Sequence, residues 1–164
     1  MPGDAAGPRH LNILFVCTGN TCRSPLAEAV CKRLLADRLH CPIEELPARG
    51  YVVASAGVAT WGGLPATPEA EAAGREVGVD LSGHRSRPVD GKLLTEATAV
   101  VAMTAGHAAL LRTRFPDAGP TPTLLTGTDD LDDPIGADAA VYRACAESIR
   151  LHLTRLLSDW LVSP

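Results

Sequence analysis

A cysteine and an arginine with five residues between them follow a short apolar run near the N-terminus. The segment Cys17–Arg23 reads Cys-Thr-Gly-Asn-Thr-Cys-Arg, and Ser24-Pro25 comes directly after it. A turn between a strand and a helix N-terminus directs successive backbone N–H groups at one point, which makes an anion site with the helix dipole behind it. Arg23 can place two donors on phosphate oxygens while it keeps its charge. The spacing therefore predicts a phosphate-binding loop.

The residue types inside this loop indicate covalent chemistry on phosphorus. Gly19 permits a tight turn and Asn20 tolerates a left-handed backbone. The positive field of the loop favours the thiolate form of Cys17, and the Ser24 hydroxyl can donate a hydrogen bond to it. A thiolate beneath a phosphate implies attack on phosphorus and a phosphocysteine intermediate. We expect the other loop residues to surround the anion as well: Thr18, Thr21 and Cys22.

The nearest structural rival for this loop is a nucleotide-binding P-loop. That motif ends in Gly-Lys followed by Ser or Thr, and the sequence has no such ending here. A helix cap that happens to contain two cysteines is the simpler alternative. The combination of a preceding strand, an internal Gly-Asn and a following Ser-Pro favours the phosphate loop over both.

An acidic segment later in the chain supplies candidates for a catalytic acid. The leaving group of such a reaction needs a proton, so a carboxyl group should face the loop. Five residues, Asp129–Asp133, include four aspartates and precede Pro134. Asp133 is the preferred candidate because the following proline restricts its backbone. Asp130 and Asp132 are the alternative acids. The segment could also be a solvated acidic loop with no catalytic role.

Strands and helices are expected to alternate along the chain. Periodicity and turn residues predict strands over Leu11–Val16, Tyr51–Ser55, Thr98–Met103 and Pro122–Leu125. They predict helices from Ser24-Pro25 onward, with Ser24 as N-cap, and over Glu69–Val77, Gly91–Ala97, Ala105–Phe115 and about Asp138–Leu161. This order implies right-handed crossovers and a parallel sheet covered on both faces, so residues 11–164 form one α/β domain. Residues 1–10 are expected to be a disordered lead-in, and 40–49 a loop.

Two helices carry apolar stripes at helical spacing, which predict their buried faces. The first stripe consists of Ala27, Val30, Cys31, Leu34 and Leu35. The second consists of Tyr142, Cys145, Ile149, Leu153, Leu156 and Trp160. Cys31 and Cys145 are therefore expected to act as small buried hydrophobes.

Composition excludes several classes of function. The net charge is −4 and no long block of like charge occurs, which argues against nucleic-acid binding. No apolar run is long enough to cross a membrane, and no secretory signal is recognised. Five cysteines are an odd number, which favours a reducing, cytoplasmic compartment. His40-Cys41 has no second pair at ligand spacing, so neither a metal nor another cofactor is expected. The expected state is a monomer or weak dimer.

These motifs resemble those of the low-molecular-weight protein tyrosine phosphatase family. The likeness is carried by Val16–Pro25 and Asp133-Pro134, and extends over nearly the whole chain after Leu11. The resemblance implies a four-stranded parallel sheet flanked by helices, with phosphorylated proteins as substrates. It implies that Cys17 is the nucleophile, that Arg23 clamps the phosphate, and that Asp133 is first acid and then base. It also gives Asn20 and Ser24 roles in shaping the loop and stabilising the thiolate.

Two more residues enter through the resemblance alone. His84, in Leu81-Ser82-Gly83-His84, is similar to the family histidine that supports the loop asparagine, although this segment carries one extra residue. Trp61, in the loop after the second strand, is placed like an aromatic pocket wall of the family. The alternatives are a surface histidine and a tryptophan that packs against a neighbour.

The position between Asn20 and Cys22 bears on the substrate. Thr21 stands where tyrosine-directed members carry Ile or Leu, and this is similar to bacterial protein-arginine phosphatases of the family. Its hydroxyl could position water beside a P–N bond. Ile135 stands where an aromatic residue usually follows Asp-Pro, so a wall for stacking a phenol ring is missing. This residue also departs from the aromatic found in the arginine phosphatases of the family. Phosphoarginine is therefore the expected substrate, with phosphotyrosine as the alternative.

Three further hypotheses concern chemistry near the same loop. A thioredoxin-coupled arsenate reductase would need a downstream cysteine pair, but no cysteine lies between Cys41 and Cys145. A non-catalytic phospho-binding module would be expected to lack the nucleophile or the acid. Cys22 could form a reversible disulfide with Cys17 and so protect the nucleophile from irreversible oxidation.

Overall fold

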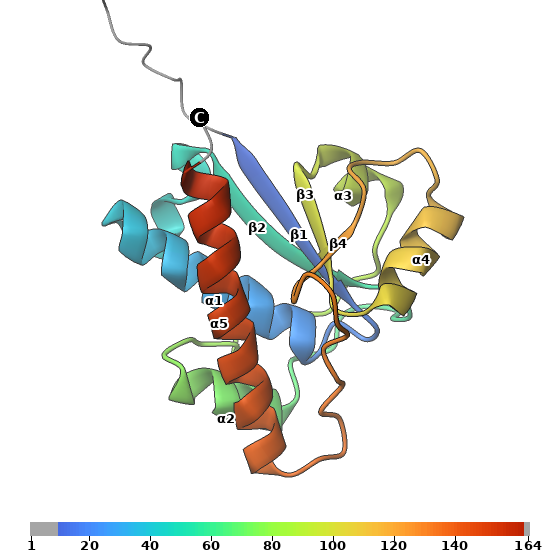
Figure 1. Cartoon of the computed structure of the whole chain (residues 1–164). Coiled ribbons are helices and arrows are strands. Elements are labelled where there is room, and N and C mark those ends of the chain that lie inside the picture. The colour runs from blue at the N-terminus through green and yellow to red at the C-terminus, as the bar shows by residue number, and fades with distance from the viewer. Residues whose placement is uncertain (1–9, 163–164) are drawn as a thin grey trace, which may run out of the picture.

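Four parallel strands form the centre of the protein (Figure 1). The computed structural model describes residues 10–162, so the predicted lead-in lies outside them except for His10. The strands are β1 (Leu11–Cys17), β2 (Tyr51–Gly57), β3 (Ala99–Ala102) and β4 (Thr123–Leu124), in the order β2-β1-β3-β4. The predicted fold class is confirmed, and β1 and β3 are the interior strands.

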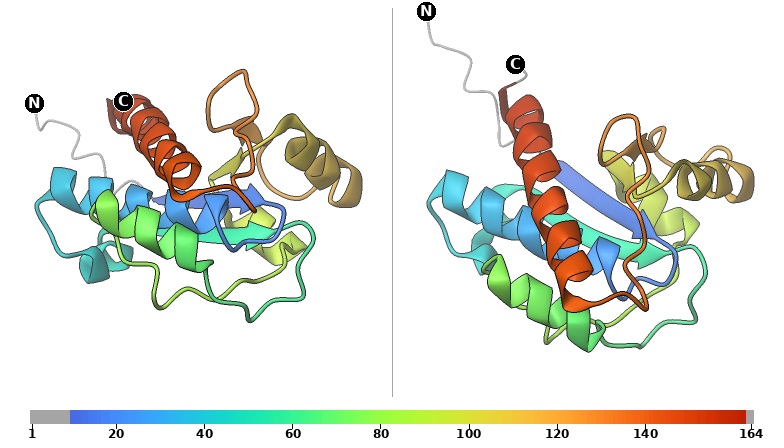
Figure 2. Two further views of the ribbon diagram at one scale, coloured as in Figure 1. Left: turned by 90° about the horizontal axis from the view of Figure 1, so that it is seen from below. Right: turned by 60° about the horizontal axis from the view of Figure 1, so that its bottom comes forward.

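Helices cover both faces of this sheet. They are α1 (Arg23–Leu39), α2 (Pro68–Glu76), α3 (Gly91–Glu96), α4 (Ala105–Arg114) and α5 (Ala139–Val162). The long helix α5 crosses α1 on one face, with α2 beside its N-terminal half, while α3 and α4 cover the other face (Figures 1 and 2). The result is a three-layer α/β arrangement.

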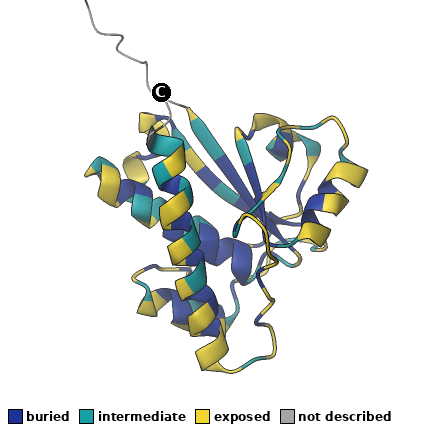
Figure 3. Ribbon diagram, in the orientation of Figure 1, coloured by how far each residue is buried: buried dark blue, intermediate teal, exposed yellow. Residues whose placement is uncertain are grey.

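The pleat of β1 explains its continuous apolar sequence. Ile13 and Phe15 point into the core against α1 and α5, whereas Leu14 and Val16 point into the core beneath α3 and α4. All four residues are buried, because a strand between two helical layers has no solvent face. Figure 3 shows the buried colour running through the strands, with exposed residues along the outer sides of the helices.

Some local predictions were wrong. Ser24 lies inside α1, and the N-cap is Cys22, which makes no side-chain capping bond. The stretch predicted as a loop over 40–49 contains two short 3-10 helices, Ile43–Glu45 and Pro47–Arg49. In α5 the buried stripe continues from Leu153 to Leu157, while Leu156 is only half-buried, because a four-residue step keeps the side chain on the same face.

Within residues 10–162, no helix is long and apolar enough to cross a membrane. The same part of the chain contains no group of three His, Cys, Asp or Glu side chains placed to hold a metal ion.

Candidate active site

The phosphate loop predicted from the sequence lies between the end of β1 and the start of α1. The end of β2 supports it, because Val58 and Ala59 donate backbone hydrogen bonds to the carbonyls of Cys17 and Thr18, each at 2.9 Å. Gly57 makes this approach possible, since a Cβ there would stand 2.6 Å from the Thr18 carbonyl oxygen. The loop is thus held against the carboxyl edge of the sheet, where ligands of such folds bind.

Asn20 holds the turn of the loop together. Its backbone is left-handed, with φ of 56°, and its side chain is fully buried. The amide nitrogen donates to Ser24 Oγ at 2.8 Å and to Ser55 Oγ at 2.9 Å, and the amide oxygen accepts from the Arg87 backbone N–H at 2.9 Å. Ser55 in turn donates to the Glu28 carboxylate at 2.7 Å. The turn is therefore fixed by bonds from three other segments.

The Cys17 thiol has a hydrogen-bond partner in Ser24. The two atoms Cys17 Sγ and Ser24 Oγ are 2.9 Å apart, and both residues are buried. Because Ser24 Oγ already accepts a hydrogen bond from Asn20, its own hydrogen is available for the sulfur. The Ser24 hydroxyl is therefore placed to donate its hydrogen to the sulfur of Cys17.

Arg23 connects the phosphate loop to the acidic segment. Its guanidinium donates to the Leu131 carbonyl at 2.8 Å and lies 3.5 Å from both Thr18 Oγ1 and the Asp133 carboxylate. Only 4% of the side chain is exposed, so the charge is held in place by these contacts. Figure 2 shows the segment before α5 running past the turn between β1 and α1.

Of the candidate acids, Asp133 is the one that faces the loop arginine. Its carboxylate is 40% exposed and also accepts from the Ile135 backbone N–H at 3.1 Å, which stiffens the turn through Pro134. Asp130 instead accepts from the backbone N–H of Ala105 at 2.7 Å and so anchors the start of α4. This geometry favours Asp133 over Asp130.

The two residues taken from the family resemblance occupy different environments. His84 Nε2 lies 2.6 Å from the Asn20 carbonyl oxygen, so the ring supports the loop through its backbone. Trp61 is fully exposed, so within residues 10–162 it packs against no neighbour. Its segment borders the loop, because the Thr67 backbone N–H donates to the Thr21 carbonyl at 2.9 Å. Trp61 as a pocket wall stays a prediction.

His107 is a site residue that the sequence interpretation missed. Its Nε2 lies 2.8 Å from Thr18 Oγ1, and the side chain is 6% exposed. The available signal was its place in the first turn after β3, because that turn lies at the same edge of the sheet as the phosphate loop. Glu28 was also missed, because it lies outside the apolar stripe of α1 and its contact with Ser55 joins two separate elements.

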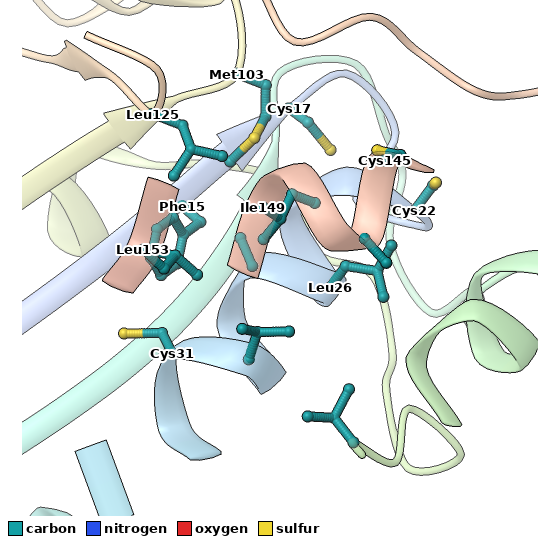
Figure 4. Close-up of a cluster of buried hydrophobic side chains, with 14 of the residues drawn as sticks. Phe15, Cys17, Cys22, Leu26, Cys31, Met103, Leu125, Cys145, Ile149 and Leu153 are labelled. Carbon is teal, nitrogen blue, oxygen red and sulfur yellow. The ribbon is translucent and has the colours of Figure 1, made fainter. Parts of the chain in front are cut away.

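All five cysteines are free thiols. Cys31 and Cys145 are buried, as predicted, and Cys145 on α5 lies in the same buried cluster as Cys17 and Cys22 (Figure 4). Burial raises the pKa of the Cys22 thiol, and the neighbouring Cys145 and Cys17 raise it further. Burial also raises the pKa of Cys145, to about 11. Both thiols are therefore protonated near neutral pH.

Comparison with known proteins agrees with this geometry. The family model described as low molecular weight phosphotyrosine protein phosphatase matches residues 12–161. The chain belongs to this family. A protein-arginine-phosphatase of Geobacillus stearothermophilus is 40% identical over 149 residues, which cover 88% of this chain and 92% of that protein.

A solved structure of the family has the same fold. It is a mutant YwlE arginine phosphatase with a phosphorylated active-site serine, which superposes with a TM-score of 0.80 at 32% identity, covering 93% of this chain and 97% of that one. An arsenate reductase of Staphylococcus aureus is 37% identical over 91 residues, but these cover only 56% of this chain and 58% of that protein.

Proposed function

We propose that this protein is a cysteine-dependent protein phosphatase that acts through a phosphocysteine intermediate, with phosphoarginine in proteins as substrate. The observation that carries the proposal is the juxtaposition of Cys17, Arg23 and Asp133. The Cys17 thiol contacts Ser24 at 2.9 Å, and Arg23 lies 3.5 Å from the Asp133 carboxylate. The free thiols are consistent with a cytoplasmic setting.

The reaction follows from these positions in two steps. The Cys17 thiolate attacks phosphorus, and the bond from phosphorus to the leaving nitrogen breaks as Asp133, as its carboxylic acid, gives that nitrogen a proton. The Asp133 carboxylate then takes a proton from water, whose oxygen attacks phosphorus and breaks the S–P bond. Inorganic phosphate leaves and Cys17 is again a thiolate. Arg23 and the loop N–H groups hold the phosphoryl oxygens throughout.

Two positions support phosphoarginine over phosphotyrosine. Thr21 has a hydroxyl where a branched aliphatic chain would offer only bulk, and its backbone is fixed by Thr67. Ile135 is 63% exposed beside Asp133 and provides no ring on which a phenol could stack. The 40% identity to a protein-arginine-phosphatase points the same way.

Hydrolysis of a phosphoarginine protein and of a phosphotyrosine peptide by the same preparation tests the substrate. We expect wild type to prefer phosphoarginine, and Thr21→Ile to shift the ratio of the two kcat/KM values toward phosphotyrosine by about tenfold, the equivalent of one lost polar interaction. A wild-type preference for phosphotyrosine would make the protein a tyrosine phosphatase.

Cys17→Ser tests the chemistry itself. It should abolish turnover while inorganic phosphate still binds, because the loop N–H groups and Arg23 remain. Turnover at the wild-type rate would remove Cys17 from the mechanism. Phosphate binding with no turnover in wild type would indicate a non-catalytic phospho-binding module.

A further inference from the structure

His107 approaches the phosphate loop from α4, on the side opposite α1. Its backbone N–H donates to the hydroxyl of Thr104, the N-cap of α4, at 3.1 Å. This bond fixes the backbone from which the imidazole extends. The ring then reaches the loop, where Nε2 lies 2.8 Å from Thr18 Oγ1. The same hydroxyl is 3.5 Å from Arg23 Nη2. Thr18 therefore links the histidine to the arginine.

Packing alone does not explain why a histidine occupies this buried position. Nδ1 of His107 is buried and has no hydrogen-bond partner among the described residues. A buried polar atom without a partner destabilises a folded protein, and an aliphatic side chain would fill the same space without that cost. The bond from Nε2 to Thr18 is the contact that an aliphatic residue could not make.

The imidazole is neutral where it meets the loop. Burial and the Arg23 charge lower the pKa of His107 to about 4, and the Asp130 and Asp133 carboxylates only partly oppose them. A neutral ring can hold the Thr18 hydroxyl without adding a second fixed charge beside Arg23. The phosphoryl group thus meets one oriented guanidinium rather than two competing cations.

We propose that His107 is a positioning residue for phosphoryl binding: it holds the Thr18 hydroxyl and, through it, the Arg23 guanidinium. The idea rests on the proposed function, because it takes the loop Cys17–Arg23 as the phosphoryl site. A purely structural role for His107 would not distinguish the two ring nitrogens. The proposal predicts that phosphate affinity depends on Nε2 and not on Nδ1.

Two substitutions separate the ring nitrogens. In His107→Gln the amide can stand where Nε2 stands, whereas in His107→Asn it reaches only the place of Nδ1. We expect the dissociation constant of inorganic phosphate, measured by calorimetry at pH 7, to rise about tenfold in His107→Asn and less than about threefold in His107→Gln. The KM of the phosphorylated substrate should rise in parallel, with a smaller change in kcat.

Thr18→Val removes the hydroxyl at nearly constant volume. We expect it to weaken phosphate binding as much as His107→Asn does, and the double variant to be no weaker than either single one, because both remove the same contact. Thr113→Val is the matched control on α4. Its exposed hydroxyl donates to the Ala109 carbonyl of the same helix, so phosphate affinity should be unchanged.

Two results would overturn the proposal. One is an equal loss of phosphate affinity in His107→Gln and His107→Asn, and the other is additive losses in the double variant. A thermal unfolding curve for each variant separates misfolding from mispositioning. Failure of the proposed function looks different: wild type would turn over no phosphorylated substrate, while the pattern of phosphate affinities could still hold.

Discussion

Asp133, the proposed catalytic acid, combines partial exposure with a fixed charge partner. Its carboxylate lies 3.5 Å from Arg23 and is 40% exposed. We predict that Asp133→Asn slows phosphoarginine hydrolysis by about 100-fold or more, because the leaving nitrogen then receives no proton. An activated aryl phosphate, whose leaving group needs no proton, should lose far less. The two substrates are compared by steady-state kinetics.

Asp132→Asn is the matched control for that experiment. Asp132 is an exposed neighbour, and it should tolerate the change with both substrates. If Asp132→Asn instead showed the dependence on leaving group, the acid would have to be reassigned to it. Asp130 is a poorer control, because it anchors α4 through Ala105.

Cys22 bears on the oxidation of the nucleophile. A peroxide would convert the Cys17 thiolate to a sulfenic acid, and the Cys22 thiolate would attack that sulfur and release hydroxide, which leaves a disulfide. Because burial raises the pKa of Cys22, its thiolate is scarce at neutral pH. We predict that the disulfide forms faster as pH rises, by about tenfold per pH unit between 7 and 9. Peptide mass mapping of quenched samples gives the rate.

Two serine variants test which cysteine pairs with Cys17. Cys22→Ser should abolish the disulfide and leave activity irreversibly lost after peroxide. Cys145→Ser should leave it intact, although Cys145 belongs to the same buried cluster (Figure 4). Loss of the disulfide in Cys145→Ser would mean that Cys22 pairs with α5 rather than with Cys17.

At the scale of elements, the site is assembled by segments that follow the strands. Cys17 ends β1, His107 lies in the helix after β3, and Asp133 lies in the segment after β4. Because the strands are parallel, their carboxyl ends meet at one edge, and this is why alternating strands and helices predicted where the chemistry lies. The apolar run of β1 and the Cys-to-Arg spacing carried this prediction.

The contacts within that edge could not be predicted in the same way. Ser24 has the residue type of an N-cap, but its hydroxyl is engaged by Cys17 and Asn20, so tertiary contacts override the local preference. Glu28 faces outward by helical spacing, yet Ser55 from β2 reaches it. His107 contacts Thr18, which lies 89 positions away, and local sequence patterns carry no information about such a distant pair.

At the scale of the whole molecule, His107 links the site to the pH dependence of folding. Its pKa falls from the ordinary value of 6.5 to about 4 when the chain folds. Above pH 6.5 the ring is neutral in both states and contributes no pH dependence. Between pH 6.5 and 4 the unfolded state binds a proton that the folded state refuses, so the free energy of unfolding decreases as pH falls.

Urea unfolding of wild type and His107→Gln at pH 7.5 and pH 4.5 measures this contribution. Other groups titrate alike in both proteins, so the difference between them isolates the histidine. We predict that acidification costs wild type roughly 1–3 kcal/mol more than the variant. An equal loss of unfolding free energy in the two proteins would mean that His107 titrates as an exposed histidine does. The conclusion that the ring beside Arg23 is neutral would then be wrong. A larger loss in wild type would show that the contact beside the phosphate loop is maintained at the expense of stability in acid.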